Sequence, residues 1–463
     1  MIISFTLCLT LFLGIGILSA WFKKNTPEDY LLASRSLSPW LAGLSAVATT
    51  NSGFMFTAWI GMTYSLGVSS VWFMLGLGFG SFVGLKTTSG PIRRVSEEVD
   101  TYSYGGLISR WQGVDMPTLR HVLGWIVLIF LSTYAAAQLT ASSKAMHVLF
   151  DWDLNTGTLL GFVVIVVYCF SGGFRASVWT DVAQSIVMMV AMIILAYIAL
   201  TEVGGIGGLY NTLKASDPDL VYWLPQLQYA PLLYIFGWFV GGIGITGQPH
   251  IMVRFMAVNS EQNAQRSLAW YFSFYCLFFF VSWLVGLAAR ALLPEVSSFD
   301  AELALPTIAE SLLPQILVGI ILAGLFAAAI STADSLVLSA SAALSRDILM
   351  RPSMSMWVTK GSTVLISLLV LGISLWGNKS VLLLVALAWS ILATAITPLL
   401  YIHIFKKPLS EIQALTMMVV GAMVAIWWFW SGIDGLIWPS FPGFAAVLVL
   451  FIIFSFVNSR RAK

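Results

Sequence analysis

Residues 324–346 read GLFAAAISTADSLVLSASAALSR, an apolar stretch that nevertheless carries one carboxylate and a row of hydroxyls. Placing such groups at membrane depth is costly, so we expect them to face protein, water or an ion rather than lipid. On an α-helix Ser331, Asp334 and Ser335 share one face, because they stand at i, i+3 and i+4. Oxygen atoms clustered in this way suit a small hard cation. The alternative is that the serines bond back to carbonyls of their own helix.

The composition around this stretch is that of a membrane protein. Of 463 residues, 59% are hydrophobic and 10% are charged, and the mean hydropathy is +0.89. Such a chain is best divided into spans of about 20 residues each. A net charge of +2 without a basic tract argues against a nucleic-acid partner. Cys8, Cys169 and Cys276 are too widely spaced for a disulfide or metal framework.

Hydropathy predicts about thirteen apolar spans. The ninth, 306–345, is longer than one crossing, and we expect it to contain a short amphipathic entry helix, 304–313, followed by the span proper. Residues 2–22 have neither a basic start nor a cleavage signal, so we expect a retained span rather than a signal peptide. The spans are 2–22, 38–64, 69–88, 119–149, 154–171, 176–201, 230–253, 267–294, 306–345, 357–376, 380–404, 412–432 and 442–458.

The basic residues set the expected orientation. With the N-terminus outside and the C-terminus in the cytoplasm, four of the 23 Lys and Arg residues lie on outer segments. This bias follows the positive-inside rule and supports an odd number of spans. The four are Lys144, Lys214, Arg290 and Lys379.

Two spans carry residues that interrupt a helix. Residues 44–59, LSAVATTNSGFMFTAW, place Thr-Thr-Asn-Ser-Gly near the middle of one. Residues 237–257, GWFVGGIGITGQPHIMVRFMA, contain five glycines and then Pro249. Gly, Pro and short polar residues weaken the helix ladder. The two spans open successive five-span units of opposite orientation, a pattern that indicates a transport site between inverted repeats. The alternative is a pair of simple kinks.

Three longer motifs resemble a known family. Residues 172–189, GGFRASVWTDVAQSIVMM, resemble the signature of the sodium/solute symporter family. Residues 247–257, GQPHIMVRFMA, and 29–46, DYLLASRSLSPWLAGLSA, are similar to segments of its bacterial sodium/proline symporters. The resemblance covers about residues 25–460.

The resemblance implies an all-α integral membrane fold, with a leucine-transporter-like core of five plus five inverted helices. One extra helix precedes this core and two follow it. The whole chain, 1–463, forms one transmembrane domain. Its expected parts are an N-terminal helix at 1–24, a first repeat at 38–203, a second repeat at 228–405 and two C-terminal helices at 412–458.

The resemblance also implies a site for Na⁺, the coupling ion. By motif match, the carbonyls of Ala48, Asn51 and Ala328 and the hydroxyls of Ser331 and Thr332 are its ligands. The physics agrees, since an unwound helix in a membrane exposes carbonyls that need a partner.

Some members of the family have a second cation site nearby. The matching positions here are Asp181, Ser331, Asp334 and Ser335. Asp181 has an alternative interpretation as an interfacial carboxylate that pairs with Arg175 or a helix N-terminus. Asp334 departs from the family, which has a hydroxyl or small residue there. It would strengthen cation binding or carry a proton.

The solute is expected near the midplane, between the two interrupted spans. Tyr134 and Gln138 stand one helical turn apart, and three alanines between them leave room for a ligand. A lone membrane Trp is more often a core or interface residue than a ligand. The candidate lining residues are Thr50, Ser52, Gly53, Tyr134, Gln138, Trp238, Gln248 and Trp389.

The expected function is import of a small organic solute with sodium through a bacterial inner membrane, with proline or another amino acid as the first candidate. Thr50 and Ile245 stand where sodium/proline symporters have an aspartate and an aromatic residue. Carboxylates, sugars and osmolytes therefore stay open, as do proton coupling through Asp334 and a ligand sensor without transport. No nucleophile–base pair or nucleotide loop is visible, so we do not expect an enzyme. The sequence also shows no sign of an obligatory protein partner, and we expect none.

Overall fold

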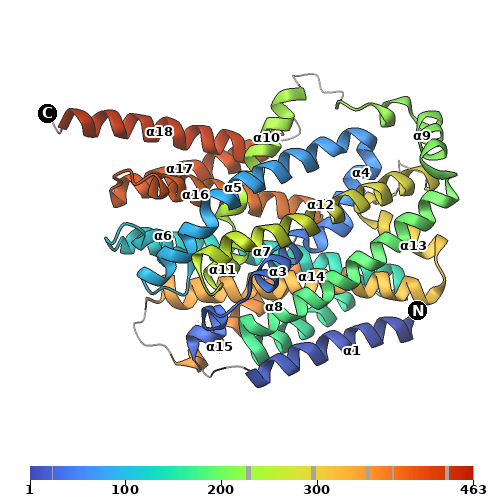
Figure 1. Cartoon of the computed structure of the whole chain (residues 1–463), viewed down its shortest axis with the longest axis horizontal. Helices are drawn as coiled ribbons and strands as arrows, with labels where there is room; N and C mark the ends of the chain where they lie inside the picture. Colours follow the sequence, from blue (N-terminus) through green and yellow to red (C-terminus); the bar gives the residue numbers. More distant parts are fainter. Residues whose placement is uncertain are drawn as a thin grey trace.

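The computed structural model describes residues 1–22, 24, 26–225, 231–293, 299–350, 355–377, 380–432 and 437–461. These residues form helices joined by short connections, and the described part contains no β-strand beyond one isolated bridge between Leu37 and Val258. The termini lie at opposite ends of the long axis (Figure 1), as an odd number of membrane crossings requires.

The first half of the chain contains the helices α1 to α9. Proline occupies the first turn of α3 and α7, where its missing N–H costs nothing. The helices are α1 (Ile2–Ser19), α2 (Pro27–Leu32), α3 (Pro39–Phe54), α4 (Ile60–Leu66), α5 (Val71–Glu98), α6 (Tyr104–Arg110), α7 (Pro117–Phe150), α8 (Leu154–Glu202) and α9 (Gly205–Ser216), with a π-helical turn η3 (Met55–Trp59) between α3 and α4.

The second half contains α10 to α18. They are α10 (Pro231–Ile243), α11 (Pro249–Met256), α12 (Glu261–Leu292), α13 (Ala304–Leu312), α14 (Gln315–Ala342), α15 (Met356–Trp376), α16 (Val381–Ile404), α17 (Glu411–Trp430) and α18 (Ser440–Arg461). A 3-10 turn η6 (Gly244–Gly247) joins α10 to α11, and a π-helical turn η8 (Ala343–Ile348) extends α14.

The predicted spans coincide with these helices. Ten helical stretches among the described residues are long and apolar enough to cross a membrane, and one of them, Pro39–Glu98, holds two predicted spans. Two shorter apolar helices, Leu154–Val167 and Pro231–Gly247, match two more. The short entry helix expected at 304–313 is α13. Residue 228, the expected start of the second repeat, lies outside the described residues.

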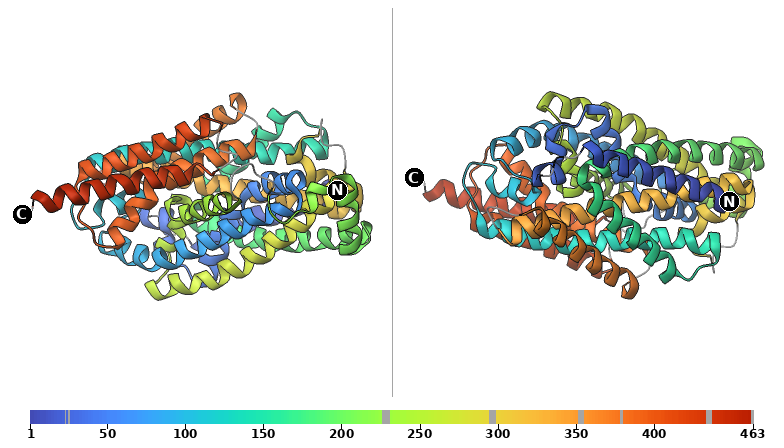
Figure 2. Two further views of the ribbon diagram at one scale, coloured as in Figure 1. Left: turned by 90° about the horizontal axis from the view of Figure 1, so that it is seen from above. Right: turned by 90° about the horizontal axis from the view of Figure 1, so that it is seen from below.

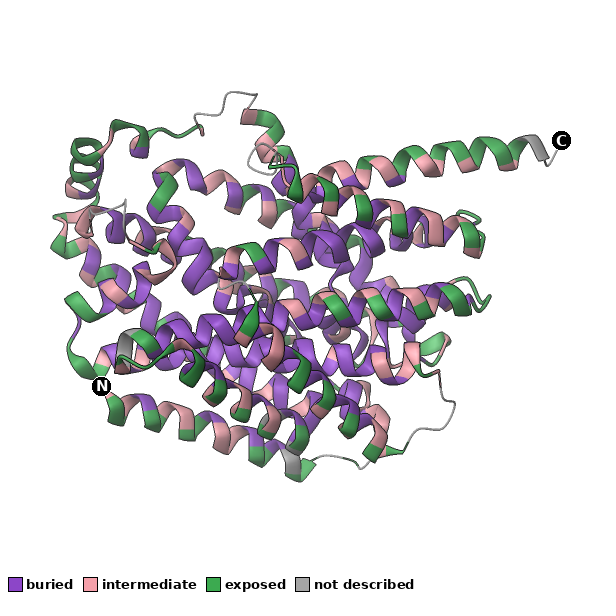
Figure 3. Ribbon diagram, turned by 180° about the vertical axis from the view of Figure 1, so that it is seen from behind, coloured by how far each residue is buried: buried purple, intermediate pink, exposed green. Residues whose placement is uncertain are grey.

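Helix α14 forms the centre of the molecule. It lies against α7 and α8 and also contacts α1, α3 and α15. In its most apolar stretch of 18 residues, 83% of the residues are buried, the highest share among the membrane-length helices described. Buried residues fill the middle of the bundle while exposed ones face outward from the peripheral helices (Figure 3). Residues 324–346 therefore lie in the core of the fold.

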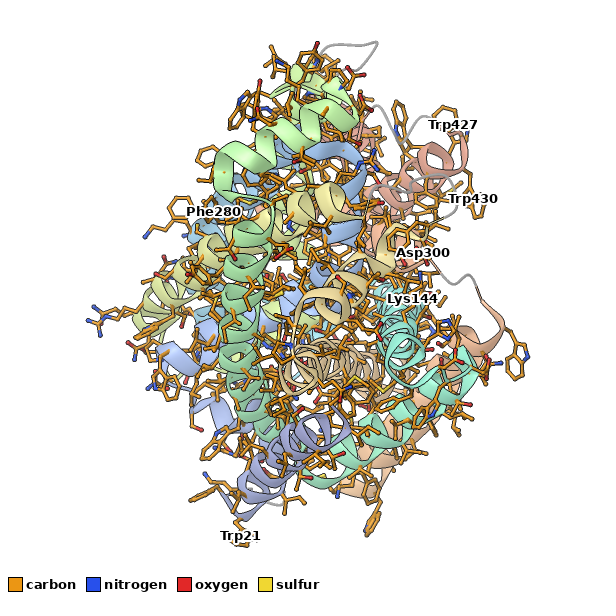
Figure 4. The ribbon with its side chains drawn as sticks, turned by 90° about the vertical axis from the view of Figure 1, so that its right-hand side faces the viewer. Trp21, Lys144, Phe280, Asp300, Trp427 and Trp430 are labelled. Carbon is orange, nitrogen blue, oxygen red and sulfur yellow. The ribbon has the colours of Figure 1, made fainter. Side chains whose placement is uncertain are left out.

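The helices at the periphery expose apolar side chains, as a lipid-facing surface does. Trp427 and Trp430 on α17 point away from the bundle, as Phe280 does on α12 (Figure 4). Helices α17 and α18 lie side by side against α16, and α18 reaches past the other helices at its C-terminal end (Figures 1 and 2).

An ion cluster joins α7 to the start of α16. The Lys144 ammonium lies 2.7 Å from a carboxylate oxygen of Asp300 and 2.7 Å from one of Glu302 (Figure 4). Glu302 also accepts hydrogen bonds from the first backbone amides of α16, those of Val381 and Leu382. A carboxylate at a helix N-terminus is favoured by the helix dipole. These contacts fix Asp300 and Glu302, just before α13, to the bundle.

Candidate functional site

The first interrupted span is broken at Ser52. Its backbone is left-handed, with φ 45° and ψ −176°. The freed amides find side-chain acceptors: the Phe54 N–H donates to the Ser52 hydroxyl at 3.1 Å, and the Gly53 N–H donates to the Gln138 carbonyl oxygen at 2.8 Å. A Cβ on Gly53 would lie 2.8 Å from the Cβ of Ala141, so only glycine lets α3 and α7 approach this closely. The predicted interruption is confirmed.

The second interrupted span is also broken, at the turn η6. Gln248 has extended backbone, with φ −98° and ψ 99°, and Pro249 then begins α11. The side-chain amide of Gln248 donates to the Trp389 carbonyl at 3.0 Å, while the Trp389 indole donates to the Gly241 carbonyl at 3.0 Å. These bonds tie the break to α16. The two breaks are therefore both held by side-chain hydrogen bonds to neighbouring helices.

The residues expected to bind sodium lie where α14 faces the first break. Ala48, Asn51, Ala328, Ser331 and Thr332 are each at most 2% exposed. The Thr332 hydroxyl donates to the carbonyl of the neighbouring Thr49 on α3 at 3.4 Å. The Ser331 hydroxyl donates to the Ala328 carbonyl at 3.2 Å, the back-bonding considered as the alternative. The two helices thus bring carbonyl and hydroxyl oxygens together.

Asn51 supplies a test of whether this region suits a cation. Neither polar atom of its side chain has a hydrogen-bond partner among the described residues, and Asn51 is fully buried. A buried polar group without a partner costs about 1–3 kcal/mol. The predicted ligand, the Asn51 backbone carbonyl, accepts a hydrogen bond from the Met55 N–H. A cation near the break would in addition give the side-chain oxygen of Asn51 a partner, so the oxygen atoms gathered here fit a small cation.

The second set of predicted cation ligands also comes together. The Ser177 hydroxyl donates to a carboxylate oxygen of Asp334 at 2.8 Å, and the Ser335 hydroxyl donates to the same oxygen at 3.0 Å. Asp181 accepts a hydrogen bond of 2.6 Å from Ser45. Both carboxylates are at most 2% exposed. Helices α3, α8 and α14 therefore share one buried polar cluster.

Arg254 from α11 lies inside this cluster, and sequence reasoning did not single it out. Its guanidinium lies 2.9 Å from an oxygen of Asp181 and 2.6 Å from the Ser335 hydroxyl, and it donates to Ser45 at 2.8 Å. Arg254 and Asp181 are both fully buried. An arginine within an apolar span needs a carboxylate, a signal that could have found this pair.

The pairing of Asp181 with Arg175, considered as an alternative, is wrong. Arg175 instead bonds Asp29 on α2 at 2.6 Å. Gly173, with φ 59°, bends α8 two residues earlier, and a Cβ there would meet the Tyr30 ring at 2.6 Å. Both residues follow the bend on one helical segment, and side chains six positions apart on an α-helix point to different sides, so Arg175 faces α2 while Asp181 faces the core.

Four predicted solute residues line one cavity of about 40 Å³: Thr50, Tyr134, Trp238 and Trp389. The other four, Ser52, Gly53, Gln138 and Gln248, form the hydrogen bonds of the two breaks and do not line it. The remaining lining residues, none of them charged, are Phe54, Met55, Phe73, Leu77, Phe279, Val385, Ala386 and Trp438.

Comparison with protein families gives one match over most of the chain. A sequence model of the "Sodium:solute symporter family" matches residues 30–421. The chain is 27% identical to the "High-affinity proline transporter PutP" of Bacillus subtilis (strain 168), over 93% of this chain and 92% of that protein. It is 28% identical to the "Sodium/proline symporter" of Escherichia coli (strain K12), over 98% and 92% respectively.

Solved structures show the same fold. A Na⁺-coupled sialic acid symporter, described in a substrate-bound outward-open state, matches with a TM-score of 0.82 at 18% identity, over 96% of this chain and 95% of its own. MhsT in complex with L-phenylalanine matches with a TM-score of 0.60 at 16% identity, over 89% and 98%. The fold class expected from the resemblance is confirmed.

Proposed function

The chain belongs to the sodium:solute symporter family and is a sodium-coupled symporter of a small solute, and from this premise we propose that it imports proline or a closely related amino acid. The observation that carries the proposal is the contact between the broken helix α3 and the hydroxyls of α14. Its curated relatives include proline transporters, which supports the choice of solute.

The proposed sodium ion is held by the carbonyls of Ala48, Asn51 and Ala328 and the hydroxyls of Ser331 and Thr332. Three of these ligands belong to α14 and two to α3, so the ion joins two helices that otherwise share one long hydrogen bond, Thr332 to Thr49 at 3.4 Å. A ligand that binds one arrangement of the helices better than another shifts the population toward it. Sodium would thereby favour the arrangement that binds the solute.

The cavity supports a compact solute. Its lining includes Thr50 and Tyr134, which carry hydroxyls, and several aromatic rings. These rings suit a solute with an apolar ring, such as proline, better than a sugar, whose many hydroxyls would lack partners among them. The two breaks beside the solute site are held in place by the hydrogen bonds of four residues: Ser52, Gly53, Gln138 and Gln248.

Proton coupling through Asp334 is the second candidate function. Two buried carboxylates lie near one guanidinium, that of Arg254: Asp181 pairs with it directly, and Asp334 is linked to it through the Ser335 hydroxyl. The excess negative charge would be balanced by a proton or by a second cation bound by Asp181, Asp334 and Ser335. Asp334→Asn distinguishes these outcomes. Altered pH dependence of uptake with an unchanged sodium response supports the proton, a raised sodium requirement supports the cation, and no change in either removes Asp334 from coupling.

The proposed location is the bacterial inner membrane, with the N-terminus outside and the C-terminus in the cytoplasm. The loop distribution of Lys and Arg supports this orientation. Accessibility of single cysteines placed at Gly113 and at Gly207, in the connection before α7 and in α9, tests it in cells lacking the native thiols. Labelling of residue 207 alone by an impermeant reagent agrees with the proposal, and labelling of residue 113 alone contradicts it.

The decisive test of function is uptake by proteoliposomes that contain the full-length protein. A panel of labelled amino acids, sugars and carboxylates is offered under an inward sodium gradient. We expect proline to accumulate above its external concentration, and accumulation to stop when sodium is replaced by potassium or when the gradient is collapsed. Accumulation of a sugar or carboxylate instead would replace the proposed solute. Solute-induced changes in fluorescence without accumulation would indicate a sensor.

A further inference from the structure

Trp438 belongs to the connection between α17 and α18, outside the five-plus-five core, yet its side chain lines the solute cavity. Its ring centroid lies 4.1 Å from that of Trp238 on α10, at an interplanar angle of 35°. Trp238 is in turn packed edge-on against Phe73 of α5, with centroids 4.2 Å apart. The C-terminal helix pair thus adds one wall to a site that the sequence assigned to the repeats alone.

The position of Trp438 is built into α10. Gly237 and Gly241 stand one turn apart on one face of this helix. A Cβ on Gly241 would lie 2.9 Å from the Cδ1 atom of Trp438, and a Cβ on Gly237 would lie 3.1 Å from its backbone nitrogen. Two glycines at i and i+4 make a groove into which the segment fits, because no side chain fills it. A residue that merely touched α10 would not require glycine at both positions.

The segment is also anchored from its own side. The indole N–H of Trp428, on α17, donates to the carbonyl of Ile437 at 2.9 Å. The indole N–H of Trp438 itself is buried and has no acceptor among the described residues. A buried donor without a partner is unfavourable, and a solute oxygen would give it one. The indole therefore has both a fixed position and an unused hydrogen-bonding group.

We propose that Trp438 is a specificity-determining residue of the solute site. Its ring is the surface on which the apolar part of a compact zwitterionic amino acid packs, and its bulk limits the size of the solutes that fit. The solute class is that of amino acids with a short side chain or a small ring, while large aromatic amino acids are excluded. This inference rests on the proposed function of sodium-coupled amino-acid uptake.

The test compares four variants in proteoliposomes at saturating sodium. Trp438→Ala should raise the KM for proline about tenfold and admit phenylalanine, which the wild type excludes. Trp438→Phe retains a ring and should stay within about threefold of the wild type. Gly241→Ala leaves the indole in the chain but displaces it, so its KM should rise as well. Trp430→Ala, on the outward face of α17, is the matched control and should leave KM and selectivity unchanged.

The half-saturating sodium concentration separates this inference from the proposed function. Trp438 lines the solute cavity and is not among the proposed sodium ligands, so all four variants should keep the sodium response of the wild type. If Trp438→Ala leaves KM and selectivity unchanged, as Trp430→Ala should, the specificity role is wrong while sodium-coupled uptake stands. If the wild type shows no sodium-driven amino-acid uptake, the proposed function fails first. Should Trp438→Ala not fold, Gly241→Ala and Trp438→Phe still decide the question.

Discussion

At the scale of single residues, Arg254 is the side chain on which the buried polar cluster depends. It reaches Asp181, Ser45 and Ser335 from α11, and so links α11 to three other helices. Removing one partner of a buried ion pair leaves an uncompensated charge, which costs about 3–5 kcal/mol. Replacing both partners costs less, because no lone charge remains buried.

We therefore predict that Arg254→Met lowers the stability of the detergent-solubilised protein by about 3–5 kcal/mol. The double variant Arg254→Met/Asp181→Asn should recover part of this loss. Arg266→Met, at an exposed position of α12, is the control and should change stability by roughly 0.5 kcal/mol or less. Thermal unfolding followed by tryptophan fluorescence measures all three. Additive losses in the double variant would show that the two side chains do not interact.

The residues of the candidate site divide by how far the sequence could predict them. Ser331, Thr332 and Asn51 were predictable because their polar groups interrupt apolar spans and match a family motif. Arg254 and Trp438 were not singled out, because their roles depend on partners distant in the sequence: Asp181 lies 73 residues from Arg254, and Trp238, on α10, precedes Trp438 by 200 residues. Hydropathy reports which residues are buried but not which ones meet.

At the scale of helices, the bend at Gly173 divides α8 into two parts. The sequence predicted two spans, 154–171 and 176–201, where the structure has one helix, α8, interrupted at this glycine. The prediction located the break within a few residues, because glycine with φ 59° is a local signal. It did not predict that Arg175 would face α2. Nor did it predict α9, whose mixed composition is less apolar than that of a span.

The ion pair between Asp29 and Arg175 fastens α2 to this bend. Burial raises the pKa of the Asp29 carboxyl, but hydrogen bonds from Arg175, the Lys24 amide and Ser34 outweigh burial, so the pKa is lowered from its usual value. A carboxyl with a lowered folded-state pKa stabilises the fold above its unfolded pKa, about 3.9. The stabilisation is lost as the pH falls through the folded-state pKa.

We predict that Asp29→Asn lowers the melting temperature at pH 7, and that the difference from the wild type shrinks as the pH falls below about 4. Melting curves in detergent at pH 7, 5, 4 and 3 measure this difference. Asp115→Asn is the control, because the Asp115 carboxylate is half exposed and 3.7 Å from Arg120. A difference that stays constant down to pH 3 would show that the Asp29 charge contributes nothing.

At the scale of the molecule, the central helix α14 brings the parts of the candidate site together. Its hydroxyls face the break in α3, its carboxylate belongs to the buried cluster, and it contacts α7, α8 and α15. Hydropathy and the family motifs predicted this arrangement well, because inverted repeats with paired breaks leave few ways to bury so many polar groups. They did not predict that the C-terminal helix pair would contribute Trp438 to the solute cavity.

The central claim is that one sodium ion joins the broken helix α3 to α14, and the sodium dependence of proline uptake by Ser331→Ala/Thr332→Ala tests it most directly. A hydrogen-bonding group that contacts a charge contributes about 1.5–3 kcal/mol, and each 1.4 kcal/mol is about tenfold in affinity. The half-saturating sodium concentration should therefore rise at least about tenfold. The control Ser345→Ala, in η8, removes a hydroxyl that donates to the Ala342 carbonyl at the end of α14 and should match the wild type. An unchanged half-saturating concentration in the double variant would contradict the claim.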